Sequence, residues 1–373
     1  MSSENGLRIK QSLQESPIYK GGNSMQMIRE KYGLEEVVKL ASNENPFPTS
    51  PHVVQALQSA MLDLNRYPPA GDDALCQALA DSLGRELTPE NFVTGNSGCD
   101  ILRMIADSFV TADDEVIICP PTFLVYELTT KRIGATLVKV PLRDPDYSYD
   151  IDGILAAVTD KTRVIYVCSP NNPTGNILTQ GEMDRLMDGI PDHVLVVADE
   201  VYHHFNTQAD YADSFKYVQE GRNIVILHSF SKVFGLAGLR LGYGVAPAHV
   251  AQYMARARLP FHINNLSYVA GIAALEDRDH LGNTVEVTLD GRARLYAGLQ
   301  AQEGVQVWPS EANFLLFKPE TMDASEMAEK LQGMGTIVRD LKGFFFPGYL
   351  RVSAGLPEEN ELFLRHLSEL LAE

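Results

Sequence analysis

Five short apolar runs, separated by amphipathic stretches, constrain the fold of this chain more than any other feature. Each run has the length and composition of a strand that is buried on both faces of a sheet. The runs are residues 116–119, 137–140, 164–168, 194–198 and 224–227. Between them, apolar residues recur at helical spacing, for example at Ile101, Leu102, Ile105 and Phe109. Strands that alternate with helices predict an α/β domain with a largely parallel sheet.

The last part of the chain has a different pattern. Residues 305–319 and 335–355 are expected to form strands of a smaller sheet, and Pro357 with the acidic residues after it is typical of a helix N-terminus. The Pro- and Asn-rich stretch 41–51 predicts a crossing between domains, and 373 residues suffice for about two domains. We expect an N-terminal arm and part of the small domain in 1–45, a large domain in 46–265 and a small domain in 266–373.

Charge and cysteine content exclude several classes of partner. The formal net charge of −18 disfavours nucleic acid and anionic membrane surfaces, which attract dense Lys and Arg patches. No apolar run approaches the roughly 18 residues of a membrane span and the N-terminus lacks a signal-peptide pattern, so we expect a cytoplasmic protein. The 4 cysteines form no CxxC pair and no metal-binding His motif is present, so neither a metal site nor a disulfide is expected.

Polar segments follow four of the expected strands, at the point where each strand ends. The segments are 93–100, 169–175, 198–205 and 228–232. In a parallel α/β sheet, ligands bind outside the carboxyl ends of the strands. These segments should therefore line one crevice.

Two of the segments carry groups that suit an anion. The Gly-Asn-Ser-Gly turn at 95–98 precedes an amphipathic helix, and such a turn presents backbone N–H groups to an anion. A plain turn capped by Ser97 is the alternative interpretation. Near Lys232, the hydroxyls of Ser229 and Ser231 and the guanidinium of Arg240 could bind a phosphate. The glycine pattern matches neither a P-loop nor a dinucleotide site.

The other two segments carry a carboxylate, a phenol and two amides. Asp199 ends a strand apolar enough to be buried, so it needs a cationic or protonated nitrogen nearby, unless it caps the next helix. Tyr202 follows with a phenol. Asn171 and Asn172 form a turn by composition, and a ligand-facing amide is the other interpretation.

Together these groups fit one cofactor. Pyridoxal phosphate has a phosphate, an aldehyde that lysine captures as a Schiff base, a pyridine nitrogen that acts as an electron sink, and a ring hydroxyl. The pKa of a lysine is ordinarily about 10.4, so Lys232 would need cationic neighbours and exclusion of water to react at neutral pH.

Almost the whole chain resembles the pyridoxal-phosphate-dependent aminotransferases of the aspartate aminotransferase fold, specifically their histidinol-phosphate aminotransferase branch. The matching stretches occur in the family's order. They are KLASNENPFP (39–48), RYPP (66–69), VTGNSGCD (93–100), PPTFLVY (120–126), SPNNPTGN (169–176), VVADEVYHHF (196–205), SFSKVFGLAGLRLGYG (229–244), ANFLLF (312–317), VRD (338–340) and YLRVSAG (349–355). The chain departs from the family pattern at 97–100, Ser-Gly-Cys-Asp in place of Gly-Ser-Asp-Glu, and at Pro48, in place of a glycine.

The resemblance implies a role for each cofactor residue. Lys232 would form the Schiff base and then act as general base and acid, while Asp199 would keep the pyridine nitrogen protonated. Tyr202 and Asn172 would hydrogen-bond the ring oxygen, and Phe123 would stack on the ring face. The phosphate would be bound by Ser97, Gly98, Cys99, Ser229, Ser231 and Arg240, with Tyr67 contributed across a homodimer interface.

The resemblance also implies a substrate site, a fold and a reaction. Arg351 would bind the anionic group of the substrate, and Arg339, Tyr19 and Asn43 would line the same pocket unless they are surface, packing or turn residues. The implied fold is a large α/β domain, with a mostly parallel seven-stranded sheet flanked by helices, plus a smaller α+β domain formed by the two chain ends. The implied reaction moves an amino group between an amino acid or a histidinol-phosphate-like amine and a 2-oxo acid, with 2-oxoglutarate and glutamate as counterpart.

Three other functions stay open. An aromatic amino acid aminotransferase is favoured if the aromatic run 344–346 and Tyr349 line the substrate site, and not if they are core residues. A lyase similar to threonine-phosphate decarboxylase would carry nearly the same motifs. A non-catalytic regulatory protein of this fold is the third, although Lys232, Asp199 and Arg240 argue against it.

Overall fold

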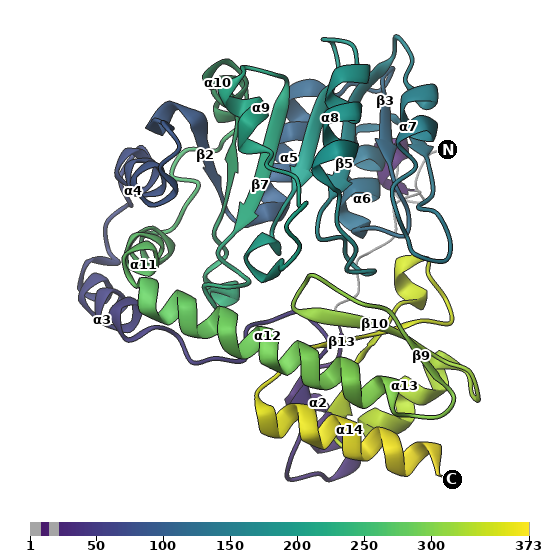
Figure 1. The fold of residues 1–373 in the computed structure, drawn as a ribbon. Coiled ribbons are helices and arrows are strands. Elements are labelled where there is room, and N and C mark those ends of the chain that lie inside the picture. Colours follow the sequence, from purple (N-terminus) through teal and green to yellow (C-terminus); the bar gives the residue numbers. More distant parts are fainter. Residues whose placement is uncertain (1–8, 15–21, 373) are drawn as a thin grey trace.

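A computed structural model describes residues 9–14 and 22–372 of the chain (Figure 1). It contains a larger sheet with helices on both faces and a smaller sheet below it in this view. Within the described ranges, no helix is both long and apolar enough to span a membrane.

The larger sheet confirms the expected fold class. Its seven strands lie in the order β2-β8-β7-β6-β5-β3-β4, and all neighbours are parallel except those of β8, which is antiparallel to both. The strands are β2 (Phe92–Gly95), β3 (Glu115–Ile118), β4 (Thr136–Lys139), β5 (Thr162–Cys168), β6 (Leu195–Asp199), β7 (Ile224–Ser229) and β8 (Gly242–Val245).

Two apolar cores cover the two faces of this sheet. Successive residues of β6 alternate between them: Val197 packs with α5, α6 and α10, whereas Val196 and Ala198 pack with the helices of the opposite face. The first face carries α5 (Gly98–Phe109), α6 (Leu124–Ile133) and α10 (Ala248–Arg256); the second carries α4 (Asp73–Leu83), α7 (Ile151–Ala157), α8 (Gln180–Gly189), α9 (Phe215–Gln219) and α11 (Asn265–Glu276), with α3 (Pro51–Ala60) beside α11.

One expected buried strand is not buried. Residues 137–140 were expected to be covered on both faces, but β4 is the last strand of the sheet and its residues are exposed or half-buried. An edge strand has a neighbour on one side only, so the apolar run alone overstated its burial.

The smaller sheet is antiparallel and confirms the expected change of pattern after residue 305. Its order is β12-β13-β10-β9, and α12, α13 and α14 pack with it or with one another. The strands are β9 (Val305–Val307), β10 (Phe314–Pro319), β12 (Arg339–Asp340) and β13 (Leu350–Ser353); the helices are α12 (Arg278–Gln300), α13 (Ala324–Gly333) and α14 (Pro357–Leu371). Helix α14 begins at Pro357, where the sequence predicted a helix start.

The two chain ends meet beside this smaller sheet. Strand β1 (Val38–Lys39) pairs in parallel with β11 (Thr336–Ile337), which forms a separate two-stranded sheet. The remaining short elements are α1 (Gln11–Gln14), α2 (Met25–Tyr32) and the 3-10 turns η1 (Met61–Asp63), η2 (Pro89–Asn91), η3 (His203–Phe205), η4 (Ala237–Leu239) and η5 (Lys342–Phe344). The domain boundaries at 45/46 and 265/266 stay predictions, and α11 packs into the core of the larger sheet.

Strand register places the polar segments level with one another. Cys168 pairs with Asp199, and Asp199 pairs with Leu227, so β5, β6 and β7 end at the same edge. The antiparallel strand β8 begins there, because Gly242 pairs with both Gly95 and Ser229. The four polar segments therefore meet at one edge of the larger sheet, facing the smaller sheet.

Candidate active site

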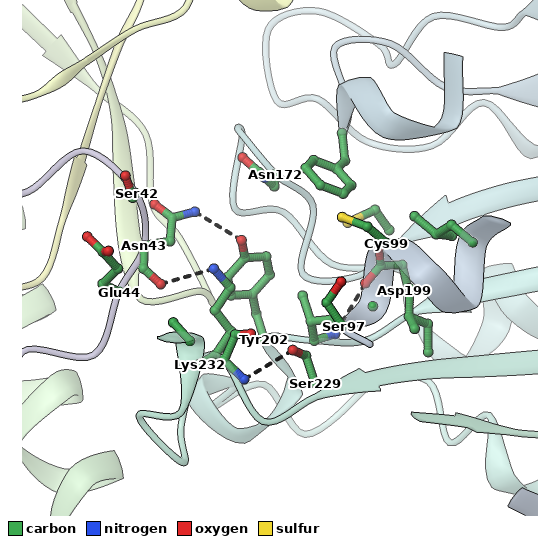
Figure 2. A pocket seen from close by; sticks show the side chains of 18 of the residues that line it. Ser42, Asn43, Glu44, Ser97, Cys99, Asn172, Asp199, Tyr202, Ser229 and Lys232 are labelled. Carbon is green, nitrogen blue, oxygen red and sulfur yellow. Dashed lines mark hydrogen bonds between the residues drawn. The ribbon is translucent and has the colours of Figure 1, made fainter. Parts of the chain in front are cut away.

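A cavity of about 400 Å³ lies at this edge, between the larger sheet and the smaller one (Figure 2). Nearly all the residues expected at the site line it. They are Asn43, Ser97, Gly98, Cys99, Phe123, Asn172, Asp199, Tyr202, Ser229, Ser231, Lys232, Arg240, Arg339 and Arg351. Tyr19 lies outside the described residues, and Tyr67 does not line the cavity.

The turn before α5 is shaped to face the cavity with its backbone. Ser97 has a positive φ of 87°, and its side chain does not cap α5, so the alternative of a plain Ser-capped turn is wrong. The first N–H groups of α5 have no partner within the helix and can bind an anion. Strand β8 passes so close that a Cβ atom on Gly242 would lie 2.5 Å from the Gly98 nitrogen, so only glycine fits there.

Arg240 and the two serines lie beside this turn. The Ser229 hydroxyl accepts the Ser231 N–H at 3.1 Å, which holds the loop between β7 and Lys232. Arg240 has a left-handed φ of 57° and donates from Nη1 to the Ala237 carbonyl at 3.0 Å. The cavity thus carries N–H, hydroxyl and guanidinium donors on one wall.

The Lys232 amine lies within hydrogen-bond distance of the stretch 41–51, which was predicted to cross between the domains. Its Nζ donates to the Asn43 carbonyl at 3.1 Å and lies 5.4 Å from the centre of the Tyr202 ring. Burial, together with the charge of Arg351, lowers the pKa of Lys232 to about 8. A larger fraction of this amine is therefore neutral near pH 7 than for an ordinary lysine, as a nucleophile or proton acceptor requires.

Asp199 is a buried carboxylate, with 2% of its surface exposed. Burial raises the pKa of its carboxyl to about 6, although the hydrogen bonds it accepts act in the opposite direction. Its Oδ2 accepts the Tyr126 hydroxyl at 2.5 Å, and its Oδ1 accepts the Val201 N–H at 3.4 Å. The bond from Val201 is long, so Tyr126 is the main hydrogen-bond partner of the carboxylate. The carboxylate remains suited to a cationic nitrogen in the cavity.

Tyr126 was not assigned a role from the sequence. It lies on α6, three positions after the N-cap residue Phe123. Its ring meets Phe123 edge-to-face at 5.6 Å and stacks on Tyr166 at 4.6 Å. The signal available in the sequence was this helical spacing, since residues three apart share a helix face. The sequence did not reveal that α6 packs near the end of β6, where Tyr126 reaches Asp199.

Two arginines of the smaller sheet reach the cavity from the opposite side. Arg339 and Arg351 are register partners across β12 and β13. The Ala41 carbonyl accepts a bond from each, from Arg339 Nε at 3.1 Å and Arg351 Nη2 at 2.9 Å. Arg351 is 3% exposed and also donates to the Asn172 side chain. Two adjacent guanidinium groups face the cavity, as an anionic ligand would require.

Of the aromatic residues near Arg351, some line the cavity and others are packing residues, the two interpretations that the sequence allowed. Phe344 lines the cavity, whereas Phe345 is largely exposed. Phe346 stacks on Tyr349 at 4.0 Å and packs edge-to-face with Tyr147, so these residues serve as packing between the two sheets. One aromatic side chain of the run is thus available to a ligand.

Tyr67 lies away from the cavity of its own chain. It is 81% exposed and stacks on Phe261 at 4.5 Å. The contact expected of Tyr67 is with the cofactor site of a partner subunit, and it stays a prediction.

Residues 35–367 match the family described as aminotransferase class I and II. The histidinol-phosphate aminotransferase of Moorella thermoacetica is 40% identical over 355 residues, covering 95% of this chain and 90% of the relative. Histidinol-phosphate aminotransferase 1 of Idiomarina loihiensis is 40% identical over 356 residues, covering 94% of each chain.

Solved structures show the same fold. A crystal structure of histidinol-phosphate aminotransferase from Sinorhizobium meliloti in complex with pyridoxal-5′-phosphate matches with a TM-score of 0.87 and 25% identity, covering 98% of both chains. The aspartate aminotransferase of Thermus thermophilus with maleate matches with a TM-score of 0.83 at 23% identity, covering 98% of this chain and all of that chain.

Replacing Asp199 by asparagine should stabilise the cofactor-free enzyme at neutral pH. The raised pKa means that the stability contributed by Asp199 is fully present below pH 3.8 and is lost as pH rises through about 6. The neutral amide of Asp199→Asn carries no such dependence. Each unit of pKa shift corresponds to about 1.4 kcal/mol, so melting temperatures should favour the variant at pH 8 but not at pH 4.

The exposed residue Asp81 provides a matched control for this comparison. Asp81→Asn should melt like the unaltered enzyme across the same pH range. A difference between Asp199→Asn and the unaltered enzyme that did not change with pH would contradict the assignment of a raised pKa to Asp199.

Proposed function

The chain belongs to the class I and II aminotransferases, and on this premise we propose that it transfers an amino group from histidinol phosphate, or a similar amine, to 2-oxoglutarate. It is a pyridoxal-phosphate-dependent enzyme that acts on small amino and oxo-acid substrates. The pair of substrates is the proposal. One observation carries it: Arg339 and Arg351 lie side by side in the cavity that contains Lys232.

The donor set of the cavity fits pyridoxal phosphate. The turn at Ser97 and Gly98 offers N–H groups to a phosphate. Because Gly242 has no Cβ, strand β8 can pass this turn without a steric clash. Asp199 offers a buried carboxylate to a protonated ring nitrogen, and Lys232 offers an amine of lowered pKa to the aldehyde. Phosphate, ring nitrogen and aldehyde each therefore have a matching group.

We propose a division of work among these residues. Bound pyridoxal phosphate supplies the electron sink that lets a bond to the substrate carbon break. Asp199 holds a proton on the ring nitrogen by its buried charge, and Phe123 covers the ring face. Lys232, once the incoming amine has released it, carries the proton between carbon atoms, for which an amine of pKa about 8 is suited. Tyr202 and Asn172 bind the ring oxygen.

The side of the cavity that carries Arg339 and Arg351, here called the substrate wall, supports an amino donor with an anionic group. A phosphate monoester or a carboxylate can accept paired hydrogen bonds from a guanidinium, and a phosphate with two negative charges can accept them from two. Arg339 and Arg351 supply that pair, and Phe344 supplies an aromatic surface near Arg339, whose guanidinium lies 5.8 Å from the ring centre. Histidinol phosphate combines a phosphate with a flat ring, and 2-oxoglutarate brings carboxylates to the same arginines.

A homodimer is part of the proposal. The exposed ring of Tyr67 follows a run of exposed apolar side chains at Met61, Leu62 and Leu64, and it stacks on Phe261. Such a cluster on the surface of one chain is typical of an interface. In a dimer of two copies, Tyr67 would reach the phosphate site of the other copy.

The substrate pair is tested with a panel of amino donors. Purified enzyme with pyridoxal phosphate should absorb visible light, and with 2-oxoglutarate as acceptor it should use histidinol phosphate better than aromatic or acidic amino acids. Lys232→Ala should lower turnover by at least about 10²-fold, because the proton carrier is lost. Release of carbon dioxide without an oxo-acid acceptor would favour a lyase instead, and a colourless enzyme would refute the proposal.

The arginine pair is tested by conservative substitution. Arg351→Lys and Arg339→Lys keep the positive charge but lose the paired donors. Each should reduce kcat/KM for histidinol phosphate by about 10- to 100-fold, while the variant still binds pyridoxal phosphate and absorbs visible light. The exposed residue Arg365 is the control, and Arg365→Lys should behave like the unaltered enzyme. Unchanged kcat/KM in both cavity variants would contradict the assigned substrate wall.

The dimer is tested by light scattering. The protein should elute with the mass of two 41.2 kDa chains. Leu62→Asp should shift it toward one chain and weaken cofactor binding in parallel, because Leu62 is 84% exposed in a single chain and would be covered only by the other copy. A monomer that binds the cofactor as tightly as the dimer would contradict the role given to Tyr67.

A further inference from the structure

Asn43 connects the two sides of the cavity through five hydrogen bonds. It is 1% exposed and has a left-handed φ of 51°. Its carbonyl accepts bonds from Lys232 Nζ at 3.1 Å and Asn313 Nδ2 at 3.3 Å. Its backbone N–H donates to the Ser353 Oγ at 2.9 Å, and its side-chain Oδ1 accepts a bond from the same hydroxyl. Its side-chain Nδ2 donates to the Tyr202 oxygen (Figure 2).

Ser353 fixes which way the Asn43 amide points. The serine oxygen accepts the Asn43 N–H, so its single hydrogen is left to donate to Asn43 Oδ1 at 3.1 Å. Among the described residues, this hydroxyl donates to no other acceptor. Exchanging the oxygen and nitrogen of the amide would leave the buried serine hydrogen unpaired, which is costly. The Asn43 NH₂ group therefore faces Tyr202.

The consequence falls on the phenol of Tyr202. Asn43 Nδ2 donates to the Tyr202 oxygen at 3.0 Å, so the phenol acts as an acceptor in this contact. Burial raises the pKa of Tyr202 above its ordinary value, so the phenol keeps its hydrogen at neutral pH. Within the described chain that hydrogen is donated to no residue, and Tyr202 lines the cavity. The hydrogen is therefore free to be donated to a ligand there.

We propose that Ser353 and Asn43 are positioning residues that direct the phenolic hydrogen of Tyr202 toward the ring oxygen of the bound cofactor. The inference rests on the proposed function and extends it, because Asn43 was expected to line the substrate pocket and Ser353 had no expected role. It assigns both residues a task on the cofactor side of the cavity.

The charged groups around Tyr202 come from several elements. Arg351 of β13, Lys232 and Asp199 affect it, as does the thiol of Cys168 at the end of β5. None of them is altered by Asn43→Gly or by changing Ser353, whereas Asn43→Asp adds a carboxylate. A change in the titration of the bound cofactor can therefore be traced to the direction of the phenolic hydrogen in the variants that add no charge.

The test is the pH dependence of the visible absorbance of the holoenzyme. A hydrogen bond donated to the ring oxygen stabilises its anionic form, so losing it should raise the pH midpoint of the absorbance change. Asn43→Asp replaces the donating NH₂ with an oxygen that accepts the phenolic hydrogen instead. This variant should raise the midpoint by about one unit. Asn43→Gly keeps the left-handed backbone and the carbonyl that holds Lys232, and it should give a smaller upward shift.

Ser353 provides a matched pair of variants. Ser353→Ala removes the hydroxyl that orients the amide and should shift the midpoint upward, whereas Ser353→Thr keeps the hydroxyl and should titrate like the unaltered enzyme. If Asn43→Asp does not fold, this pair carries the test alone. Equal titration of Ser353→Ala and Ser353→Thr would overturn the role of Ser353.

A second background separates a positioning role from a general structural one. Tyr202→Phe has no phenolic hydrogen, so Asn43→Gly and Ser353→Ala, which add no charge, should produce no further shift when combined with it. A shift that persisted in the Tyr202→Phe background would overturn the proposal, as would an unshifted Asn43→Asp enzyme. An unaltered enzyme that developed no visible band with pyridoxal phosphate would instead mean that the proposed function itself is wrong.

Discussion

The carboxylate of Asp199 ends the central strand β6, and its burial is the constraint on which the rest of the site depends. Only 2% of Asp199 is exposed, because β5, β6 and β7 end at the same edge of the sheet and α6 packs against them. Burial makes the charged carboxylate unfavourable, and the Tyr126 hydroxyl relieves only part of that cost. A cationic ring nitrogen beside the carboxylate would offset the rest of the cost of burying its charge. The cofactor-free enzyme thus holds an unfavourable charge that a ligand can satisfy.

The opposite wall is organised around a short segment of backbone. The carbonyls of Ala41 and Asn43 together accept bonds from Arg339, Arg351 and Lys232, all three of which carry positive charge when protonated. Lone pairs on backbone oxygens can hold cations in place without neutralising them, which a carboxylate would do. The arginines remain charged and oriented toward the cavity, and the charge of Arg351 contributes to the lowered pKa of Lys232. Arg351 and the Lys232 amine are therefore coupled electrostatically.

Sequence and structure agree where local pattern and topology determine the position of a residue. The apolar runs and the polar segments after them predicted the parallel sheet and the edge where Lys232, Asp199 and Asn172 meet, because parallel strands present their carboxyl ends on one side. The same reasoning overstated the burial of β4, since an apolar run does not reveal whether a strand has neighbours on both sides. It also left the aromatic run 344–346 ambiguous, and the fold directs Phe344 to the cavity and Phe346 to packing.

By itself, therefore, the sequence determined the fold class and pointed to Lys232 and the donor set of the cavity, because each follows from short-range pattern or from motifs of a few consecutive residues. Only the tertiary structure decided the contacts made between distant segments. Tyr126 reaches Asp199 across 73 positions of chain, and Ser353 reaches Asn43 across 310. Hydrogen-bond direction in such pairs depends on which partner has a free hydrogen after its neighbours are satisfied, and that is set by three-dimensional packing and not by spacing along the chain.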